Sequence, residues 1–443
     1  MTATATELTR GDAPPAGRLP RLLAGIDAGD GTVELTDHLA RWGPLAVTRH
    51  GAKLLDEVEA SGLVGHGGAW FPVATKWRAV GGRRLRTPVV VANGAEGEPA
   101  SRKDALLLHR VPHLVLDGAG VAAAAVGADR VVAYVPRTAA AGVQRAVDER
   151  RARGIDRIGI EVVTAPEAFI SGQESAAVNV LNGRPQPAPS FVGLRSIRDR
   201  GVGGRPTLVQ NAETLAHVAL VARYGAAWFR SVGTAEAPGS MLLTVTGRWS
   251  GPTVVEASLG APLDHVLGLM PDDAGQYRGV LLGGYGGTWV KTDAVFGLRL
   301  DERSVRRAGA TLGAGVVVLL PSGHCPLAEV ANVVRYMDAQ GAGQCGPCVN
   351  GLGELVAHLD TLAFGRPARR SRAVPDILGL ADLVEGRGAC RHPDGVARFV
   401  RSAVAVFSDE IAAHQRQGPC RASTGPAFLP IPASRQRLRV AAP

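Results

Sequence analysis

Residues 89–92 read VVVA, and this apolar run decides the fold together with two runs that follow it. The second run is VVAYV at 131–135, and the third is IEVV at 160–163. Short runs rich in valine are typical of strands that are buried on both faces. Apolar residues recur at helical spacing between these runs, over 106–126 and over 139–151. Strands and helices in alternation predict a parallel α/β sheet that is covered by helices.

The pattern changes towards the C-terminus. Strand-like stretches at 241–247, 254–256 and 280–287 predict a small β-rich module. After Pro326 the spacing becomes helical in four stretches, which predicts a helical bundle: 327–337, 352–362, 377–384 and 396–407. We therefore divide the chain into a tail and lead-in (1–45), an α/β domain (46–236), the β-rich module (237–322), the bundle (323–417) and a polar tail (418–443).

Composition excludes several classes of protein. The chain has 443 residues, of which 46% are hydrophobic and 20% are charged, as in an ordinary globular protein of several domains. It contains no apolar run of about 18 residues, so we expect no membrane span. The first residues lack the apolar segment of a secretory signal, and we expect a cytoplasmic protein that reaches a membrane only through a partner.

The net charge of +9 comes from an arginine-rich chain with only four lysines. Most of this charge is explained by a solvated surface, and the remaining interpretation is a patch that attracts an acidic protein partner or an anionic cofactor. No aromatic RNA-binding motif or zinc-finger spacing occurs, so nucleic acid is not an expected partner.

A glycine-rich loop precedes the first strand. Residues 62–72 read GLVGHGGAWFP, and Lys76 follows. Glycines let backbone N–H groups surround a phosphate, and a nearby lysine can add its charge. The spacing matches neither of the two common nucleotide-binding glycine motifs. Phosphate or nucleotide binding and a purely structural turn are therefore both open from the residues alone.

All five cysteines lie in the last third of the chain: Cys325, Cys345, Cys348, Cys390 and Cys420. An odd number without a signal peptide is a poor disulfide framework. Thiolates at the spacing of Cys345 and Cys348 suit an iron–sulfur cluster or zinc. The same CGPC motif also occurs in thioredoxins, but there it follows a strand, whereas a helical pattern precedes it here. A dithiol redox protein stays as an alternative.

Four motifs in order carry a resemblance to the NADH-binding flavoprotein subunit of respiratory complex I. They are GHGGAWFP at 65–72 with Lys76-Trp77 behind it, NGAEGEP at 93–99, FISGQESA at 169–176, and GRPT with QNAETL between 204 and 215. The resemblance covers about residues 47–415. It implies a Rossmann-like FMN-binding domain, and it identifies the β-rich module as similar to the SLBB β-grasp domain of that family.

The resemblance also implies roles for single residues. Glu96 and Glu174 would line the nicotinamide pocket as catalytic residues. From the residues alone, carboxylates in a Gly/Pro turn, here Glu96 and Glu98, are more often solvated or cap the next helix. For the same reason Lys103-Asp104 reads as a surface pair at a helix start. The residues implied to bind cofactor are Gly65, Gly67, Gly68, Phe71, Lys76, Asn93, Gly172, Asn211 and Thr214.

Cys345, Cys348 and Cys390 match three of the four ligands of the family's [4Fe–4S] cluster, and the first ligand falls on Ala342. A cluster of this kind ordinarily takes four thiolates. The fourth ligand would come from Cys325, Cys420, His324 or an external donor. Otherwise one iron stays open, or the cluster is absent.

The implied function is electron transfer from NADH through FMN to the cluster and on to a ferredoxin-like or thioredoxin-like subunit. The chain departs from the family pattern at several positions near the dinucleotide, namely Trp70, Ala79, Ala95, Gln173 and Gln210. Ala79, Ala95 and Gln173, together with Ala342, favour a second interpretation, an electron-relay or docking subunit that has lost NADH binding.

Overall fold

The computed structural model describes residues 16–26, 31–45, 51–82, 86–184, 188–190, 196–365 and 373–432. Most of the N-terminal tail predicted from the sequence, up to residue 15, lies outside the described residues. No helix in these described ranges is both long and apolar enough to cross a bilayer.

The first domain contains the predicted parallel sheet, which is confirmed. Its strands are β1 (Val89–Asn93), β2 (Arg130–Pro136), β3 (Ile160–Ala165) and β4 (Thr207–Asn211), in the order β3-β2-β1-β4. The chain moves outward from β1 to β3 and then returns to place β4 on the other side of β1. This reversal puts Asn93 and Asn211, which are in register, at the carboxyl ends of two adjacent strands.

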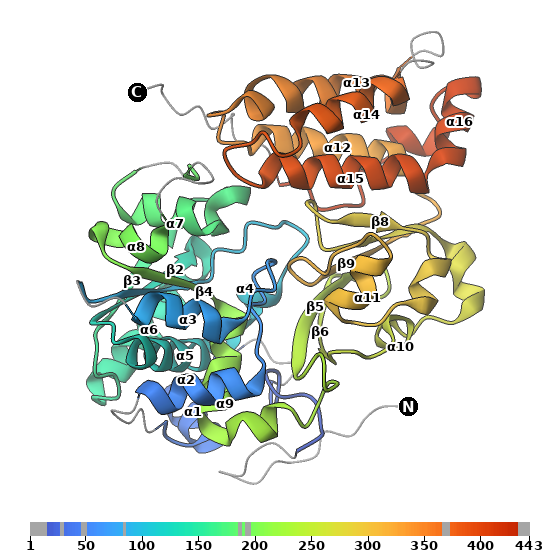
Figure 1. The fold of residues 1–443 in the computed structure, drawn as a ribbon. Helices are drawn as coiled ribbons and strands as arrows, with labels where there is room; N and C mark the ends of the chain where they lie inside the picture. Colours follow the sequence, from blue (N-terminus) through green and yellow to red (C-terminus); the bar gives the residue numbers. More distant parts are fainter. Residues whose placement is uncertain are drawn as a thin grey trace.

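Both faces of the central strands β1 and β2 are buried, which explains their apolar runs, whereas the edge strand β3 is exposed at Glu161 and Thr164. Val90 and Ala92 pack into a core built largely from α5 (Pro112–Val126) and α9 (Ala212–Phe229). Val89 and Val91 face the opposite core, under α7 (Glu174–Leu181). Figure 1 shows the helices on both sides of the sheet. The others are α1 (Leu35–Trp42), α2 (Gly51–Ser61), α3 (Val73–Gly81), α4 (Lys103–Arg110), α6 (Arg137–Ala152) and α8 (Ile197–Arg200).

The helical pattern over 106–126 corresponds to two helices rather than one. Helix α4 ends at Arg110, and Pro112 begins α5. Proline lacks the N–H that a continuous helix needs, and it favours the first position of a new helix.

The second domain is a mixed five-stranded sheet beside the first (Figure 1). Its order is β6-β5-β9-β7-β8, and β5 and β9 run parallel in the centre while the other pairs are antiparallel. The strands are β5 (Ser240–Thr246), β6 (Thr253–Ser258), β7 (Tyr277–Leu282), β8 (Thr288–Val290) and β9 (Val316–Pro321), with short helices α10 (Leu263–Leu267) and α11 (Glu302–Arg307).

The C-terminal region is helical. The first three predicted stretches lie within helices, and the fourth, 396–407, ends one residue beyond its helix. The helices are α12 (Pro326–Ala339), α13 (Leu352–Phe364), α14 (Ala373–Val384), α15 (His392–Val406) and α16 (Ser408–Gln417), of which the sequence did not indicate the last. The segment 418–432, predicted as the start of a polar tail, packs against these helices. Its Phe428 and Leu429 N–H groups donate to the Glu329 carboxylate at 2.7 and 3.0 Å, and Leu429 is buried.

Candidate functional site

The glycine-rich loop connects α2 to α3 and lies over the carboxyl ends of β1 and β4. Its base is closed by the Gly65 N–H, which donates to the Phe71 carbonyl at 2.9 Å. A side chain at Gly67 would meet Asn211, since an added Cβ would lie 3.2 Å from the Asn211 Cβ. In the described part of the chain, the N–H groups of residues 67, 68 and 69 have no acceptor. Three adjacent unpaired N–H groups form a cradle that fits an anion such as a phosphate.

The two asparagines at the strand ends hold the neighbouring loops. The Asn93 side chain donates to the Gly172 carbonyl at 2.8 Å. Asn211 caps α9 by accepting the Thr214 N–H at 3.3 Å, and its amide donates to Asp104 at 2.7 Å. The Thr214 hydroxyl is buried and accepts the His66 N–H at 2.9 Å. The structure therefore brings these predicted site residues together at one edge of the sheet, while their contacts to a flavin stay a prediction.

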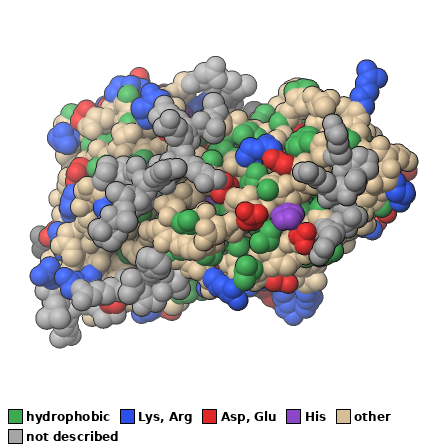
Figure 2. Space-filling view, turned by 90° about the horizontal axis from the view of Figure 1, so that it is seen from above, with side chains coloured by type: hydrophobic (Ala, Val, Ile, Leu, Met, Phe, Trp, Pro, Cys, Tyr) green, Lys and Arg blue, Asp and Glu red, His purple; other side chains and the backbone are tan. Residues whose placement is uncertain are grey.

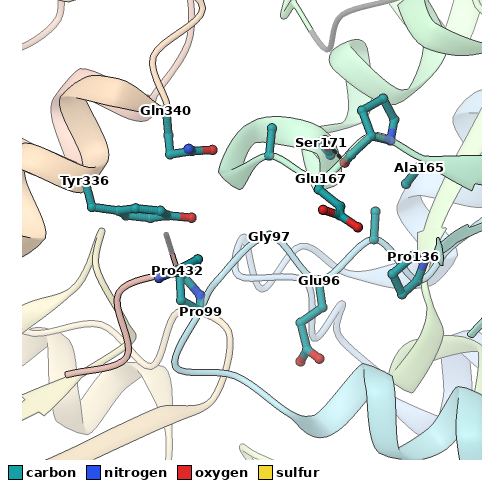
Figure 3. Close-up of a pocket in the computed structure, with 13 residues that line it drawn as sticks. Glu96, Gly97, Pro99, Pro136, Ala165, Glu167, Ser171, Tyr336, Gln340 and Pro432 are labelled. Carbon is teal, nitrogen blue, oxygen red and sulfur yellow. Dashed lines mark hydrogen bonds between the residues drawn. The ribbon is translucent and has the colours of Figure 1, made fainter. Parts of the chain in front are cut away.

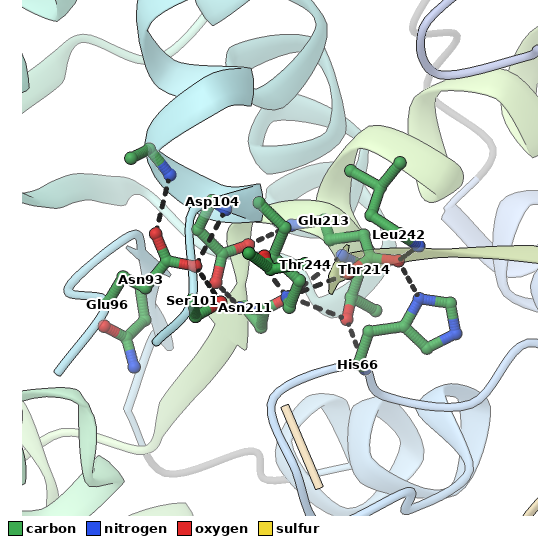
Figure 4. Close-up of polar contacts among 12 residues, drawn as sticks. His66, Asn93, Glu96, Ser101, Asp104, Asn211, Glu213, Thr214, Leu242 and Thr244 are labelled. Atoms are coloured by element: carbon green, nitrogen blue, oxygen red, sulfur yellow. Dashed lines mark hydrogen bonds and ion pairs between the residues drawn. The ribbon is translucent and has the colours of Figure 1, made fainter. Parts of the chain in front are cut away.

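A buried ionic network lies beneath the loop (Figure 4). The Glu213 carboxylate accepts from His66 Nδ1 at 2.8 Å and from the Leu242 N–H at 2.7 Å, and its second oxygen lies 2.8 Å from Lys103 Nζ. Lys103 also pairs with Asp104 at 3.1 Å. The network thus joins the loop, α4, α9 and the first strand of the second domain.

The interpretation of Lys103-Asp104 as a surface pair is wrong, because Lys103 is only 1% exposed. Burial alone would lower the pKa of Lys103, but the carboxylates of Asp104 and Glu213 raise it above its usual value. Burial alone would likewise raise the pKa of Glu213, whereas Lys103 and His66 hold it well below its usual range. One signal for this network is present in the sequence, because Lys103 is one of only four lysines in an arginine-rich chain.

Glu96 adopts the capping arrangement that sequence reasoning offered as its second interpretation. Its carboxylate accepts the Asp104 N–H at 3.1 Å, the Ala105 N–H at 3.0 Å and the Ser101 hydroxyl (Figure 4). Burial and the nearby Asp104 raise the pKa of Glu96. Capping α4 is therefore one function of Glu96, and a catalytic role stays a prediction.

Lys76 and Glu174, which the resemblance places in the same site, form an ion pair. Lys76 Nζ donates to Glu174 and to the Val209 carbonyl at 2.5 Å, near the end of β4. The Glu174 side chain is 46% exposed. A phosphate in the cradle would therefore compete with Glu174 for the Lys76 ammonium.

Trp70, which replaces a glycine of the family motif, keeps a left-handed backbone with φ of 52°. Its indole N–H donates to the Gly313 carbonyl at 3.1 Å, and its ring packs on the core of the second domain. The indole therefore serves as a contact between the two domains. Phe71 beside it is 46% exposed on the loop, where a planar ligand can reach it.

Cys345, Cys348 and Cys390 come together at the C-terminal end of α12. Burial, followed by the Cys345 and Cys390 thiols, raises the pKa of Cys348 to about 12. Backbone N–H groups face two of these sulfurs, from Gly343 to Cys348 and from His392 to Cys390. Amide hydrogen bonds to sulfur are a feature of iron–sulfur sites, so the donor set fits a cluster.

The other three residues considered as a fourth ligand are not beside this trio. Cys325 caps the opposite end of α12, which has 14 residues and is therefore about 21 Å long. Cys420 lies with Cys325, and the ring of His324 packs on Phe428 at 5.0 Å. All three are wrong as ligands of the cluster. Ala342, at the first ligand position, is buried and offers no donor.

Phe169 connects the loops at the sheet edge to the cysteine region. Its N–H donates to Gln340 of α12 at 2.9 Å, and its ring lies 5.5 Å from that of His392. On its other side Phe169 packs tightly on the loop after β1, because a Cβ at Gly97 would lie 2.0 Å from the Phe169 carbonyl oxygen. The residues drawn in Figure 3 line a cavity at this junction, with Tyr336 and Gln340 on one side and Glu167 and Ser171 on the other, and its volume is about 230 Å³.

Two family comparisons match separate parts of the chain. Residues 58–220 match the Nuo51 FMN-binding domain, and residues 328–414 match the iron–sulfur binding region of NADH-ubiquinone oxidoreductase-F. These ranges include the glycine loop and strand ends in the first case, and the cysteine trio in the second.

Similar proteins and structures agree with this division. The chain is 31% identical over 399 residues to the F subunit of the NADH-quinone oxidoreductase from Mycobacterium tuberculosis, covering 85% of this chain and 87% of the relative. It is 28% identical over 419 residues to the F 2 subunit of the same enzyme from Rhizobium meliloti, covering 90% and 96%. An air-oxidized NAD+-reducing [NiFe]-hydrogenase matches with a TM-score of 0.76 and 26% identity, over 93% of this chain and 69% of that one. The chain belongs to the family of NADH-quinone oxidoreductase F subunits.

Proposed function

We propose that this chain binds FMN in the cradle of residues 65–69, takes electrons from NADH and passes them to an iron–sulfur cluster held by Cys345, Cys348 and Cys390. The observation that carries the proposal is the junction at Phe169. The turn Phe169–Gly172 accepts a hydrogen bond from the Asn93 side chain at Gly172, and its Phe169 ring contacts His392, two residues after Cys390. FMN, when bound, accepts two electrons and releases them singly.

The first domain supplies the flavin contacts. The N–H cradle and Lys76 bind the phosphate, while Asn93 and Asn211 present amides at the strand ends where ligands of parallel α/β sheets bind. Thr214 acts by fixing the His66 backbone, and Gly172 allows close packing, because a Cβ there would lie 2.4 Å from the Ala95 carbonyl oxygen. The loop is thus held in shape before a ligand arrives.

NADH binding rests on fewer contacts. Phe71 is exposed on the glycine-rich loop, Glu174 is exposed at the start of α7 where it pairs with Lys76, and Glu96 lines the cavity of Figure 3. The contact of Trp70 with the second domain leaves Phe71 accessible, which supports NADH oxidation over the interpretation of a relay that has lost the dinucleotide. The thioredoxin alternative loses support because the helix α12 precedes Cys345.

The cluster would have three protein thiolates. With Ala342 at the first position and no cysteine of the described chain within reach, the fourth iron takes an external donor or keeps an open site. The three thiolates are screened from solvent unequally, since Cys348 and Cys390 are buried and Cys345 is partly exposed.

An electron-transfer partner would dock near this cluster. Val349, which follows Cys348, is 56% exposed, and Leu383 of α14 is 52% exposed. The turn Pro347–Gly351 packs on α14 through Gly351 and Val384, so the two apolar side chains belong to one region. Figure 2 shows apolar, acidic and basic side chains mixed on the face seen from above. We infer a ferredoxin-like or thioredoxin-like subunit that combines apolar and charged contacts.

The finer domain assignments belong to the same proposal. The central parallel pair β5–β9, with antiparallel strands on either side, supports an SLBB-type β-grasp module over 237–322. Helices α12 to α15 support a four-helix bundle over 323–417, and the FMN and NADH domain spans 46–236.

Lys76→Ala tests the cradle, with the exposed Lys53→Ala as its matched control. We expect Lys76→Ala to lose FMN on gel filtration at least about tenfold more readily, because a charge-assisted contact to phosphate is worth roughly 1.5–3 kcal/mol. Lys53→Ala keeps its flavin. Equal flavin retention in the two variants contradicts the assignment of Lys76.

A further inference from the structure

A second group of metal-binding side chains lies at the end of α12 that is remote from the cluster. It consists of Cys325, Glu410, His414 and Cys420, here called the α16 site. Cys325 caps α12, Glu410 and His414 are one turn apart on α16, and Cys420 follows that helix. One potential ligand atom from each side chain lies within 4.8 Å of all the others. Cys325 is 2% exposed and His414 is 1% exposed.

The distances within the α16 site are those of a tetrahedral zinc site. Cys325 Sγ lies 3.7 Å from His414 Nε2, and Glu410 Oε1 lies 3.5 Å from the same nitrogen. Zinc bonds of about 2.3 Å to sulfur, 2.05 Å to nitrogen and 2.1 Å to oxygen place such ligand pairs about 3.6 and 3.4 Å apart at tetrahedral angles. These two pairs therefore already have the spacing of a zinc site, and the Cys420 N–H, which now donates to Nε2, would turn away when an ion enters.

The groups around the site orient the ligands. His414 Nδ1 lies 3.3 Å from the Leu362 carbonyl, which fixes the hydrogen on Nδ1 and leaves the lone pair of Nε2 towards the thiols. This backbone carbonyl contact is the usual support of a zinc-bound histidine. The N–H groups of Leu327 and Ala328, at the start of α12, face the Cys325 sulfur and would donate to a metal-bound thiolate there. At present the Cys420 N–H occupies the Nε2 lone pair at 3.2 Å, the position that a metal would take.

We propose that the α16 site binds one zinc ion through Cys325, His414, Cys420 and Glu410. Two thiolates and one imidazole in a closed tetrahedron select zinc over magnesium or calcium, which prefer oxygen ligands. With four protein ligands and no open position, the ion is structural. It holds the segment after α16 against α12. The N–H groups of Phe428 and Leu429 in this segment donate to Glu329, and its Pro430 carbonyl accepts the Tyr285 hydroxyl at 2.7 Å.

Zinc and iron contents of the anaerobically purified full-length chain test this proposal. We expect zinc in a ratio near one per chain. His414→Gln lowers zinc about tenfold or more and leaves iron unchanged, whereas Cys348→Ser lowers iron and leaves zinc unchanged. Because Glu410 is partly exposed, Glu410→Gln serves as a second variant that folds and binds zinc more weakly in competition with a chromophoric chelator.

The proposal is overturned if wild-type protein supplied with zinc holds none against the chelator, or if both His414→Gln and Glu410→Gln hold it as tightly as the wild type. It is also overturned if peptide mapping finds Cys325 and Cys420 joined in a disulfide in the anaerobic protein. Each result is independent of flavin content, so the α16 site and the flavin assignment fail separately.

Discussion

Replacing Lys103 by methionine tests the buried network that supports the flavin loop. Methionine keeps the length and apolar stem of the side chain but removes the ammonium that lies 2.8 Å from Glu213 and 3.1 Å from Asp104. Both carboxylates are nearly free of solvent, so their charges lose a partner that water cannot replace.

The expected cost is about 3–5 kcal/mol, the range measured when one partner of a buried ion pair is removed. At roughly 2–4 °C per kcal/mol for a domain of this size, the first domain should unfold about 6–20 °C earlier. The assay is thermal unfolding followed by flavin fluorescence and by circular dichroism at constant pH and salt. Because the network holds the His66 side chain of the glycine-rich loop through Glu213, flavin release should accompany the shift.

Lys53→Met is the matched control, since Lys53 is exposed on α2. A surface substitution of this kind changes stability by about 0.5 kcal/mol or less. The double variant Lys103→Met with Glu213→Gln should recover part of the loss, because it removes the uncompensated charge. A melting temperature of Lys103→Met within the range of the control refutes the reasoning.

Three further predictions follow from buried groups. Burial raises the pKa of Glu98 to about 7, so stability should fall as pH rises from about 4.5 to 7, and Glu98→Gln should flatten the melting temperature over that window. Gly97→Ala should give a poorly folded or flavin-free protein, because its Cβ would lie 2.0 Å from the Phe169 carbonyl oxygen, and native flavin content in this variant would show that the junction is looser. Asp117→Asn should lower the free energy of unfolding by about 3–5 kcal/mol, because His38 and nearby arginines hold the pKa of this buried carboxyl well below its usual range. Thermal unfolding at pH 7 measures this change, and a loss below about 1 kcal/mol would contradict the role of Asp117.

Strands β1, β2 and β3 could be predicted from the sequence as short valine-rich runs, which full burial on both faces explains for β1 and β2, but the sequence analysis did not indicate β4. The glycine motif indicated phosphate chemistry, since that chemistry restricts the residues that fit, whereas Asn93 and Asn211 were indicated only by the resemblance to the family. The break at Pro112 had a visible signal in the proline itself. These features depend on local geometry, which short stretches of sequence carry.

Contacts between distant segments could not be predicted in the same way. Lys103 reads as a surface residue because its principal partner, Glu213, is 110 positions away and belongs to another helix. Cys325 and Cys420 are 95 positions apart, and only the fold brings them to one end of α12. In both cases the residue types indicate chemistry, but tertiary packing determines which partners they meet.

Anaerobic reduction of the purified chain by NADH tests the central claim most directly. The account predicts that NADH bleaches a bound flavin and that electron paramagnetic resonance then detects a reduced iron–sulfur cluster, a signal that Cys348→Ser removes while flavin bleaching persists. Two results contradict this account. In the first, NADH bleaches the flavin of the iron-loaded wild type but no cluster signal appears. In the second, the chain binds no flavin when FMN is supplied in excess.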